Sequence, residues 1–382
     1  MKRVLASLLV FAAADLSAAR RVGFGADVFN QVVPFDRAES VVFSPLAFEL
    51  DCAVFAEAMD TLPRAAVSEA LGSLGGIEST YAPIVATLSD PTNGLPIVMA
   101  RAFCLPDERL AQPVLREELY RNFGTASCRL YPKEGAEAWL RVTTEGRFDD
   151  FQVEIDPARA DRYCFYDLVS FRTDWLRPFP SSATKNLAFA CANGEKVTCA
   201  FVCDTRDCDL WESKDALLLR LPLRGGADFY AMLPSEKLAL SELRADFSSV
   251  GIDELLTVTK SVTARGVWHG PAEIALPKMS VSSRHDLLPT LTARRIPVSP
   301  MRRLGVEAVR EIVQQTKFTL DEAEYGVAAL APSAAAEGAA KRAVFDRPFL
   351  YFIHHPQTES LLVAGIFFGS AADCRQGKDK NT

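Results

Sequence analysis

Four cysteines lie close together near the middle of the chain, and thiolates in such a group can be zinc ligands or disulfide partners. The segment "CANGEKVTCAFVCDTRDC" contains Cys191, Cys199, Cys203 and Cys208. It lacks the Cys-x-x-Cys knuckle that structural zinc sites commonly use. A zinc site is therefore disfavoured, and a disulfide between Cys203 and Cys208 is the stronger alternative for an exported protein.

The histidines give no sign of catalysis. The chain has four, of which only His354 and His355 are adjacent, and neighbours on a strand point to opposite faces. The sequence also lacks the Gly-x-Ser-x-Gly elbow, the Walker loop, the dinucleotide-binding glycine pattern and the His-Glu-x-x-His motif. We therefore expect neither an enzyme nor a bound cofactor or metal.

The composition bounds the class of protein. The chain has 382 residues, of which 49% are hydrophobic, so it can bury a large core. Its formal net charge is -7, and its lysines and arginines are spread along the sequence. This distribution offers no concentrated cationic face for a phosphate backbone or an anionic lipid surface. Nucleic acid and membranes are not predicted partners.

The first residues have the pattern of a secretory signal peptide. Lys2 and Arg3 precede an apolar run over 4–14, and small residues at 17–19 suit cleavage after residue 19. The apolar run is too short to span a bilayer, and no later run is long enough. We expect residues 1–19 to be removed and the mature protein to be secreted and extracellular.

Local patterns predict the elements of one domain. Two helices are expected near the N-terminus, one capped by Ser44 with Pro45 in its first turn and one starting near Thr61. The stretch over 160–175 is apolar on both faces, which is typical of a central strand. Further helices are predicted at 116–124, 135–146 and 285–295, strands at 195–203, 95–105, 272–281 and 309–320, and hairpins at 215–234 and 349–369. Helices first and strands later indicate one α+β domain over 20–370, followed by a polar tail over 371–382.

Six motifs occur in the order and at about the spacing found in serpins. They are "VVFSP", "VTTEGRF", "YDLVSFRTDWLRPF", "IALPKMSV", "TLDEAEYG" and "FDRPFLYFIHHPQTESLLVAGIFF". Together they cover about residues 22–369, nearly the whole mature chain. The chain thus resembles the serpin family.

The resemblance implies a fold and a mechanism. It implies a five-stranded sheet A, two smaller sheets, eight to nine helices, and an exposed reactive-centre loop over about 323–344. A serine protease cleaves this loop and is trapped when the loop inserts into sheet A as a new strand. The expected protein is accordingly a monomeric suicide substrate, with a target serine protease as its partner.

The resemblance also assigns a region where sheet A parts to admit the loop. Trp175 matches the tryptophan below the entry point, and Lys278 matches the ion-pair partner of Glu322 at the loop's base. Ser44 matches the serine beneath the parting strands. Two positions depart from the family pattern: Asp167 stands where asparagine is usual, and Gln314 where histidine is usual. Acid and amide can still form a hydrogen bond, but a buried carboxylate without a cation would be destabilising.

The start of the loop, called the hinge, also departs from the family pattern. Inhibitory members usually have a glycine and a small hydroxyl residue soon after the acid, whereas Glu324 and Tyr325 follow Glu322 here. Shifting the alignment to place Gly326 at the glycine position puts Val327 next, before Ala328 and Ala329. With Tyr325 as the first inward residue, every later inward residue is small: Val327, Ala329, Ala331, Ser333 and Ala335.

The resemblance also implies where the loop is cleaved: counting back from Phe345 by the spacing usual in the family, the bond falls near Glu337-Gly338. Counting from the hinge moves it to Gly338-Ala339. A target that prefers an acidic residue is then expected, and an elastase-like protease that cuts at Ala334 to Ala336 is the other option. The alternative function is a non-inhibitory serpin that acts as a binding or carrier protein or a protease substrate, because of Glu324 and Tyr325.

Overall fold

The computed structural model describes residues 21–36, 39–59, 61–73, 76–107, 109, 111–130, 133–153, 161–249, 251–260, 267–322, 340–370 and 373–374. Residues 21–32 are helical. The labelled helices are α2 (Pro45–Ala58), α3 (Thr61–Ala70), α4 (Ile77–Ser89), α5 (Pro113–Phe123), α6 (Lys133–Thr143), α7 (Gly251–Lys260) and α8 (Leu288–Ala293). Together with the segment 21–32, the described chain has eight α-helices, in agreement with the expectation.

The strands form two sheets. The five-stranded sheet has the order β10-β11-β4-β2-β3, formed by β10 (Met279–Asp286), β11 (Val309–Leu320), β4 (Tyr163–Arg172), β2 (Ile97–Leu105) and β3 (Thr125–Arg129). The nine-stranded sheet comprises β1 (Val41–Phe43), β5 (Lys185–Ala190), β6 (Lys196–Glu212), β7 (Ala216–Pro222), β8 (Asp228–Pro234), β9 (Val267–Pro277), β12 (Lys341–Val344), β13 (Phe349–His355) and β14 (Ser360–Phe367). The α+β class and the five-stranded sheet are confirmed.

The two smaller sheets that we expected are joined into one hydrogen-bonded path. The strand β6 is 17 residues long and is shared by both halves. Its first part pairs with β5, its last part pairs with β7, and β9 lies along most of its length. The length of β6 therefore joins the two expected smaller sheets into one.

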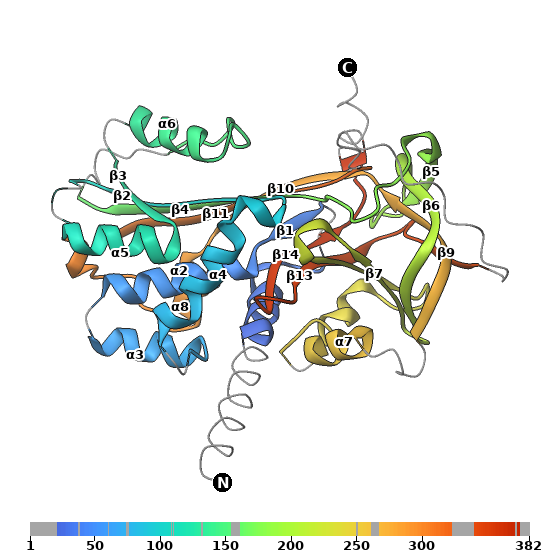
Figure 1. Cartoon of the computed structure of the whole chain (residues 1–382), viewed down its shortest axis with the longest axis horizontal. Coiled ribbons are helices and arrows are strands. Elements are labelled where there is room, and N and C mark those ends of the chain that lie inside the picture. The colour runs from blue at the N-terminus through green and yellow to red at the C-terminus, as the bar shows by residue number, and fades with distance from the viewer. Residues whose placement is uncertain are drawn as a thin grey trace, which may run out of the picture.

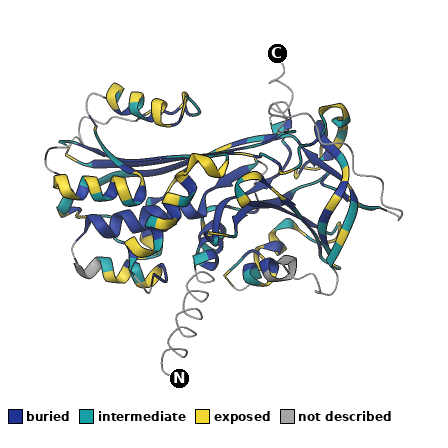
Figure 2. Ribbon diagram, viewed as in Figure 1, coloured by how far each residue is buried: buried dark blue, intermediate teal, exposed yellow. Residues whose placement is uncertain are grey.

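The central helix α2 and the central strand β4 follow directly from their sequences. Every residue of α2 is buried, and all but Glu49, Asp51 and Glu57 are apolar, which is typical of a helix in a core. In Figure 2 α2 is dark blue along its length, whereas α6 exposes its outer side. The strand β4 is buried except at Arg172, because sheet neighbours and covering layers enclose it.

The five-stranded sheet is covered on both faces. Figure 1 shows α6 on one face and α2 and α5 on the other, with the nine-stranded sheet beyond one end. The residues under α6 form a separate apolar cluster that includes Leu140 and Phe151. Both faces of the sheet are therefore packed.

Several element predictions differ from the structure. The expected strand over 272–281 is divided at Lys278, where the chain leaves β9 in one sheet and enters β10 in the other. The helices α4 and α7 and the strands β3, β5 and β12 were not predicted. Pro83 lies inside α4, and an internal proline normally argues against a helix.

The cysteine prediction was wrong in its pairing. Cys199 forms a disulfide with Cys374, and Cys203 and Cys208 are free and buried. Both free cysteines lie on the single strand β6, where an odd separation places side chains on opposite faces. The disulfide fastens the expected polar tail over 371–382 to the domain at Cys374.

The expected loop over 323–344 ends earlier than predicted. Residues 341–344 form β12, which pairs in parallel with β9, and Lys341 and Arg342 make ion pairs with Glu212 and Glu273. Residues 323–339 lie outside the described residues, as do residues 1–20 with the predicted signal peptide. Among the described residues, no helix is long and apolar enough to cross a membrane.

Candidate functional site

The boundary between β4 and β11 is the central feature of the five-stranded sheet, and we call it the seam. The two strands are parallel and come from distant parts of the sequence, with Val309 beside Tyr163 at one end and Thr319 beside Arg172 at the other. The chain leaves the seam at the C-terminal end of β11, which is Leu320. The segment that follows therefore starts at this end of the seam, where Thr319 lies beside Arg172, and we call it the open end.

Gln314 and Asp167 face each other across the middle of the seam. They are direct partners in the register of β11 and β4, and neither is exposed. Because both side chains are polar and buried, each needs a partner inside the protein. Gln314 binds Ser44, which caps α2, and Asp167 binds Arg101, which also binds Asp51 of α2.

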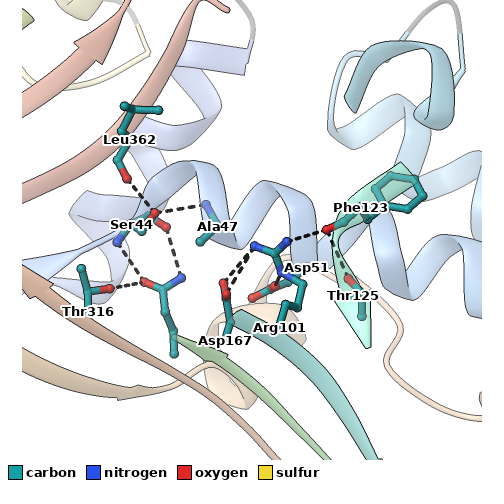
Figure 3. A network of polar contacts seen from close by, with 10 residues as sticks. Ser44, Ala47, Asp51, Arg101, Phe123, Thr125, Asp167, Thr316 and Leu362 are labelled. Atoms are coloured by element: carbon teal, nitrogen blue, oxygen red, sulfur yellow. Dashed lines mark hydrogen bonds and ion pairs between the residues drawn. The ribbon is translucent and has the colours of Figure 1, made fainter. Parts of the chain in front are cut away.

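Ser44 connects the start of α2 to β11. The Gln314 side chain accepts a hydrogen bond from the Ser44 backbone N at 2.9 Å and donates one to the Ser44 backbone O at 3.2 Å. Thr316 Oγ1 donates to the same Gln314 Oε1. The Ser44 hydroxyl donates to Leu362 O at 2.6 Å and accepts from Ala47 N, so it caps α2 as predicted. Figure 3 shows the contacts around Ser44, with Ala47, Thr316 and Leu362 labelled.

Arg101 connects β4 to α2. Its Nε donates to Asp51 Oδ1 of α2 at 2.8 Å, and its Nη2 donates to Asp167 Oδ2 of β4 at 3.3 Å. Its Nη1 donates to Phe123 O, at the end of α5. All three side chains are buried, and Figure 3 shows Arg101 joined by dashed lines to both carboxylates. We call Asp51, Arg101 and Asp167 the buried charge cluster.

The cluster contains two acids and one base, so a proton is needed for neutrality. Burial, together with the nearby Asp167 carboxylate, raises the pKa of Asp51 well above its usual range. Burial opposes the charge on Arg101, but the two acids outweigh it and raise the pKa of the guanidinium. Burial also raises the pKa of Asp167. The favoured state therefore holds one proton on the pair of acids, beside a charged Arg101.

These contacts revise one expectation and add two residues. An acid-to-amide hydrogen bond between Asp167 and Gln314 was considered possible, but their recorded partners are Arg101 for the acid and Ser44 and Thr316 for the amide. The cation that a buried Asp167 needs is present. Arg101 and Asp51 were missed, although each is a charged residue inside an apolar stretch, which is a usable signal for a buried ion pair.

A second polar group holds the end of β11, just before the expected loop. Lys278 Nζ lies 2.7 Å from Glu322 Oε2, and the Thr184 hydroxyl donates to Glu322 Oε1 at 2.6 Å. The Lys278 and Glu322 side chains are each only 14% exposed, so water screens their attraction less than at the surface. Burial alone would raise the pKa of Glu322, but the hydrogen bonds from Lys278 and Thr184 lower it.

Trp175 holds the neighbouring residue from below. Its Nε1 donates to Asp321 O at 2.8 Å, and its ring packs edge-on against Phe179 and Phe229. Arg172, at the end of β4, forms an ion pair with the Asp321 side chain. The chain is thus fixed up to Glu322 at the open end of the seam. The predicted hinge residues Glu324 to Ala329 and the cleavage-site residues Ala336, Glu337, Gly338 and Ala339 lie outside the described residues.

Glu49 of α2 gives the fold a testable pH dependence. The side chain is buried, and its Oε2 accepts a hydrogen bond from Tyr81 OH at 3.4 Å. Burial raises the pKa of Glu49 from 4.5 to about 8, against the attraction of Arg21. The folded protein therefore holds this proton more tightly than the unfolded chain. Its contribution to stability is complete below pH 4.5 and is lost as the pH rises through about 8.

We expect the substitution Glu49→Gln to remove this dependence. In the wild type, one proton can change the free energy of unfolding by up to about 1.4 kcal/mol per pH unit. Urea unfolding at several pH values between 4.5 and about 8 gives the free energy of unfolding as a function of pH. We expect this free energy to fall less steeply with pH in Glu49→Gln than in the wild type. The exposed substitution Glu117→Gln on α5 is the control and should keep the wild-type slope. Equal slopes in all three proteins would contradict the assignment.

The fold and the seam define a mixed α+β protein in which the chain leaves one of two parallel central strands at the end of β11. A family model described as "Serpin (serine protease inhibitor)" matches residues 19–369. The chain belongs to the serpin family.

Relatives support this membership at low identity. The chain is 25% identical to plasminogen activator inhibitor 1 of Sus scrofa, over 92% of each chain. It is 23% identical to the "Probable non-inhibitory serpin-Z5" of Arabidopsis thaliana, over 70% of this chain and 62% of that protein. Among solved structures, native protease nexin-1 with heparin superposes with a TM-score of 0.80 at 18% identity. The superposed region covers 93% of this chain and 99% of the nexin chain. Maspin superposes with a TM-score of 0.78 at 13% identity, over 94% and 100%.

Proposed function

We propose that this chain is a secreted serpin that inhibits a serine protease as a suicide substrate. In this proposal the protease cleaves the segment between β11 and β12 near Glu337-Gly338. The part that remains attached to β11 then enters the seam as a new strand. The family model and the relatives named as plasminogen activator inhibitor 1 support an inhibitory function.

The parallel pairing of β4 and β11 is the observation that carries the proposal. A segment that continues from the end of β11 and folds back must run antiparallel to β11, and hence also to β4. Insertion would replace one parallel ladder with two antiparallel ladders, and antiparallel pairing is slightly more stable per residue. The uncut protein lacks the freedom to make this exchange, so its state is trapped kinetically.

The buried groups at the seam explain why insertion needs a driving force. Gln314 is tied to Ser44, and Asp167 is tied through Arg101 to Asp51, so both strands of the seam are fastened to α2. To separate the strands, the side chains of Gln314 and Asp167 must move apart. A cut that frees the segment supplies the new ladders that offset this separation.

The anchor at Glu322 defines where insertion begins. Lys278 and Thr184 hold Glu322, and Trp175 holds Asp321, so the reversal of the chain must start after Glu322. The small inward residues from Val327 to Ala335 suit burial under the sheet. Tyr325, which precedes them, is the one large residue expected to face inward.

A second candidate function is a non-inhibitory serpin that binds or carries another molecule or is simply cleaved. Tyr325 and the acidic Glu324 favour it, because both depart from the inhibitory hinge. The similarity to a protein named a probable non-inhibitory serpin is consistent with this alternative. Both candidates share the fold and differ only in whether the cut segment inserts.

Incubation with a panel of serine proteases tests the proposal. We expect an SDS-stable covalent complex with a protease that prefers an acidic residue, and its loss in the variant Glu337→Ala. The variant Lys341→Ala, altered in β12, should retain the complex. A complex that survives Glu337→Ala and forms with an elastase-like protease would move the cleaved bond to Ala334–Ala336. Cleavage by every protease without any stable complex would overturn the inhibitory function.

A further inference from the structure

Three cysteines form a row across three adjacent strands of the five-stranded sheet. In the register of the sheet, Cys104 of β2 lies opposite Cys128 of β3 on one side and opposite Cys164 of β4 on the other. All three pack in the apolar cluster under α6. The function proposed above uses none of them.

The central cysteine is in direct contact with Cys128. Cys104 Sγ and Cys128 Sγ lie 2.9 Å apart. Neighbouring strands are about 4.8 Å apart, which is within the range of Cα separations that a disulfide spans. The Cys164 thiol instead interacts with the Tyr166 side chain. A bond between Cys104 and Cys128 therefore needs only a small movement of side chains.

The two thiols differ in access. Cys104 is fully buried, whereas Cys128 is partly exposed. The contact with Cys128, together with burial, raises the pKa of the Cys104 thiol, which makes Cys104 the poorer first nucleophile. Burial also raises the pKa of Cys164, to about 12. A reagent from solvent thus meets Cys128 first.

We propose that Cys104 and Cys128 are a redox site that a low-molecular-weight disulfide, such as oxidised glutathione, converts into a disulfide between β2 and β3. The Cys128 thiolate attacks the reagent, forms a mixed disulfide and releases one thiolate. The Cys104 sulfur then attacks Cys128 Sγ and displaces the second thiolate, which takes up the Cys104 proton. The two protein thiols are oxidised and the reagent is reduced to two thiols.

The position of this bond sets its physical effect. It would join two strands on the same side of the seam, so β4 and β11 remain free to separate. It would also restrict the unfolded chain between residues 104 and 128. We therefore expect oxidation to raise the melting temperature by a few degrees.

The test uses the full chain, reduced and then equilibrated with oxidised glutathione. Free thiols are alkylated, and peptides are mapped without reduction. We expect a cross-linked peptide pair that contains Cys104 and Cys128, and near-complete loss of alkylation at both. In Cys104→Ala, which lacks the resolving thiol, glutathione should accumulate on Cys128. The variant Cys164→Ala should still form the cross-link.

The disulfide between Cys199 and Cys374 serves as an internal control for the oxidant. If that bond forms while Cys104 and Cys128 both stay open to alkylation, the proposal is overturned. It is also overturned if Cys104 pairs with Cys164 as often as with Cys128. Neither outcome depends on protease inhibition, so this test is independent of the proposed function.

Discussion

Replacing Arg101 by methionine is expected to lower the free energy of unfolding by about 3 to 5 kcal/mol. The substitution keeps a long apolar side chain but leaves Asp51 and Asp167 buried without their cation. It also removes the hydrogen bond to Phe123 O. An uncompensated buried charge is far more destabilising than the loss of an exposed ion pair. Urea unfolding at constant pH measures the difference.

Two further proteins separate loss of the cation from loss of packing. The control Arg121→Met removes an arginine of α5 that is 71% exposed, and should change the free energy of unfolding by less than about 1 kcal/mol. Adding Asp51→Asn and Asp167→Asn to Arg101→Met removes both acids and should recover part of the stability. If Arg101→Met unfolds like the wild type, the buried charge cluster does not hold the sheet to α2.

Replacing Tyr325 by threonine is expected to increase the trapping of protease by roughly tenfold relative to simple cleavage. On the proposed mechanism Tyr325 must enter the seam first, before later residues pair. Forcing a large side chain into a packed site costs about 1 to 3 kcal/mol, and about 1.4 kcal/mol changes a rate tenfold. A faster insertion leaves less time for the protease to complete hydrolysis. The ratio of SDS-stable complex to cleaved inhibitor measures this partition.

The alternation of inward and outward side chains along the inserted strand provides a control for Tyr325→Thr. Residue 328 falls on the outward side if 325, 327 and 329 face inward, so Ala328→Thr should leave the partition nearly unchanged. A similar gain from both variants would point to the added hydroxyl group rather than to the size of the inward side chain. No change with Tyr325→Thr would mean that the hinge does not limit insertion.

Local patterns predicted both strands of the seam, at 160–175 and 309–320, and the helix α2 to which they are fastened. The helix that begins after Ser44 and the strand buried on both faces at 160–175 appear as α2 and β4, because capping and periodicity act over a few residues. The order and spacing of the six motifs then indicated the serpin family. These signals were sufficient for the α+β fold and for the position of the candidate site in the sheet.

Contacts between residues far apart in the sequence could not be predicted from local patterns. Asp51, Arg101 and Asp167 meet because β2 pairs with β4 and α2 packs on the sheet that they form, and no spacing in the sequence encodes that meeting. The disulfide between Cys199 and Cys374 joins residues 175 positions apart for the same reason. The local alternative at Cys203 and Cys208 failed because both residues share one uninterrupted strand. Sequence spacing suggested proximity, but the strand geometry prevented it.

Insertion of the cut segment into the seam is the central claim, and thermal unfolding before and after cleavage tests it most directly. An inserted strand of about ten residues would add roughly ten hydrogen bonds at about 1 kcal/mol each, and a gain of that size raises the melting temperature on the order of 20 °C. The inward variant Ala329→Arg should be cleaved equally well but should show little rise, whereas the outward variant Ala328→Arg should behave like the wild type. We predict a large rise on cleavage of the wild type and not of Ala329→Arg. An unchanged melting temperature after complete cleavage of the wild type would contradict insertion.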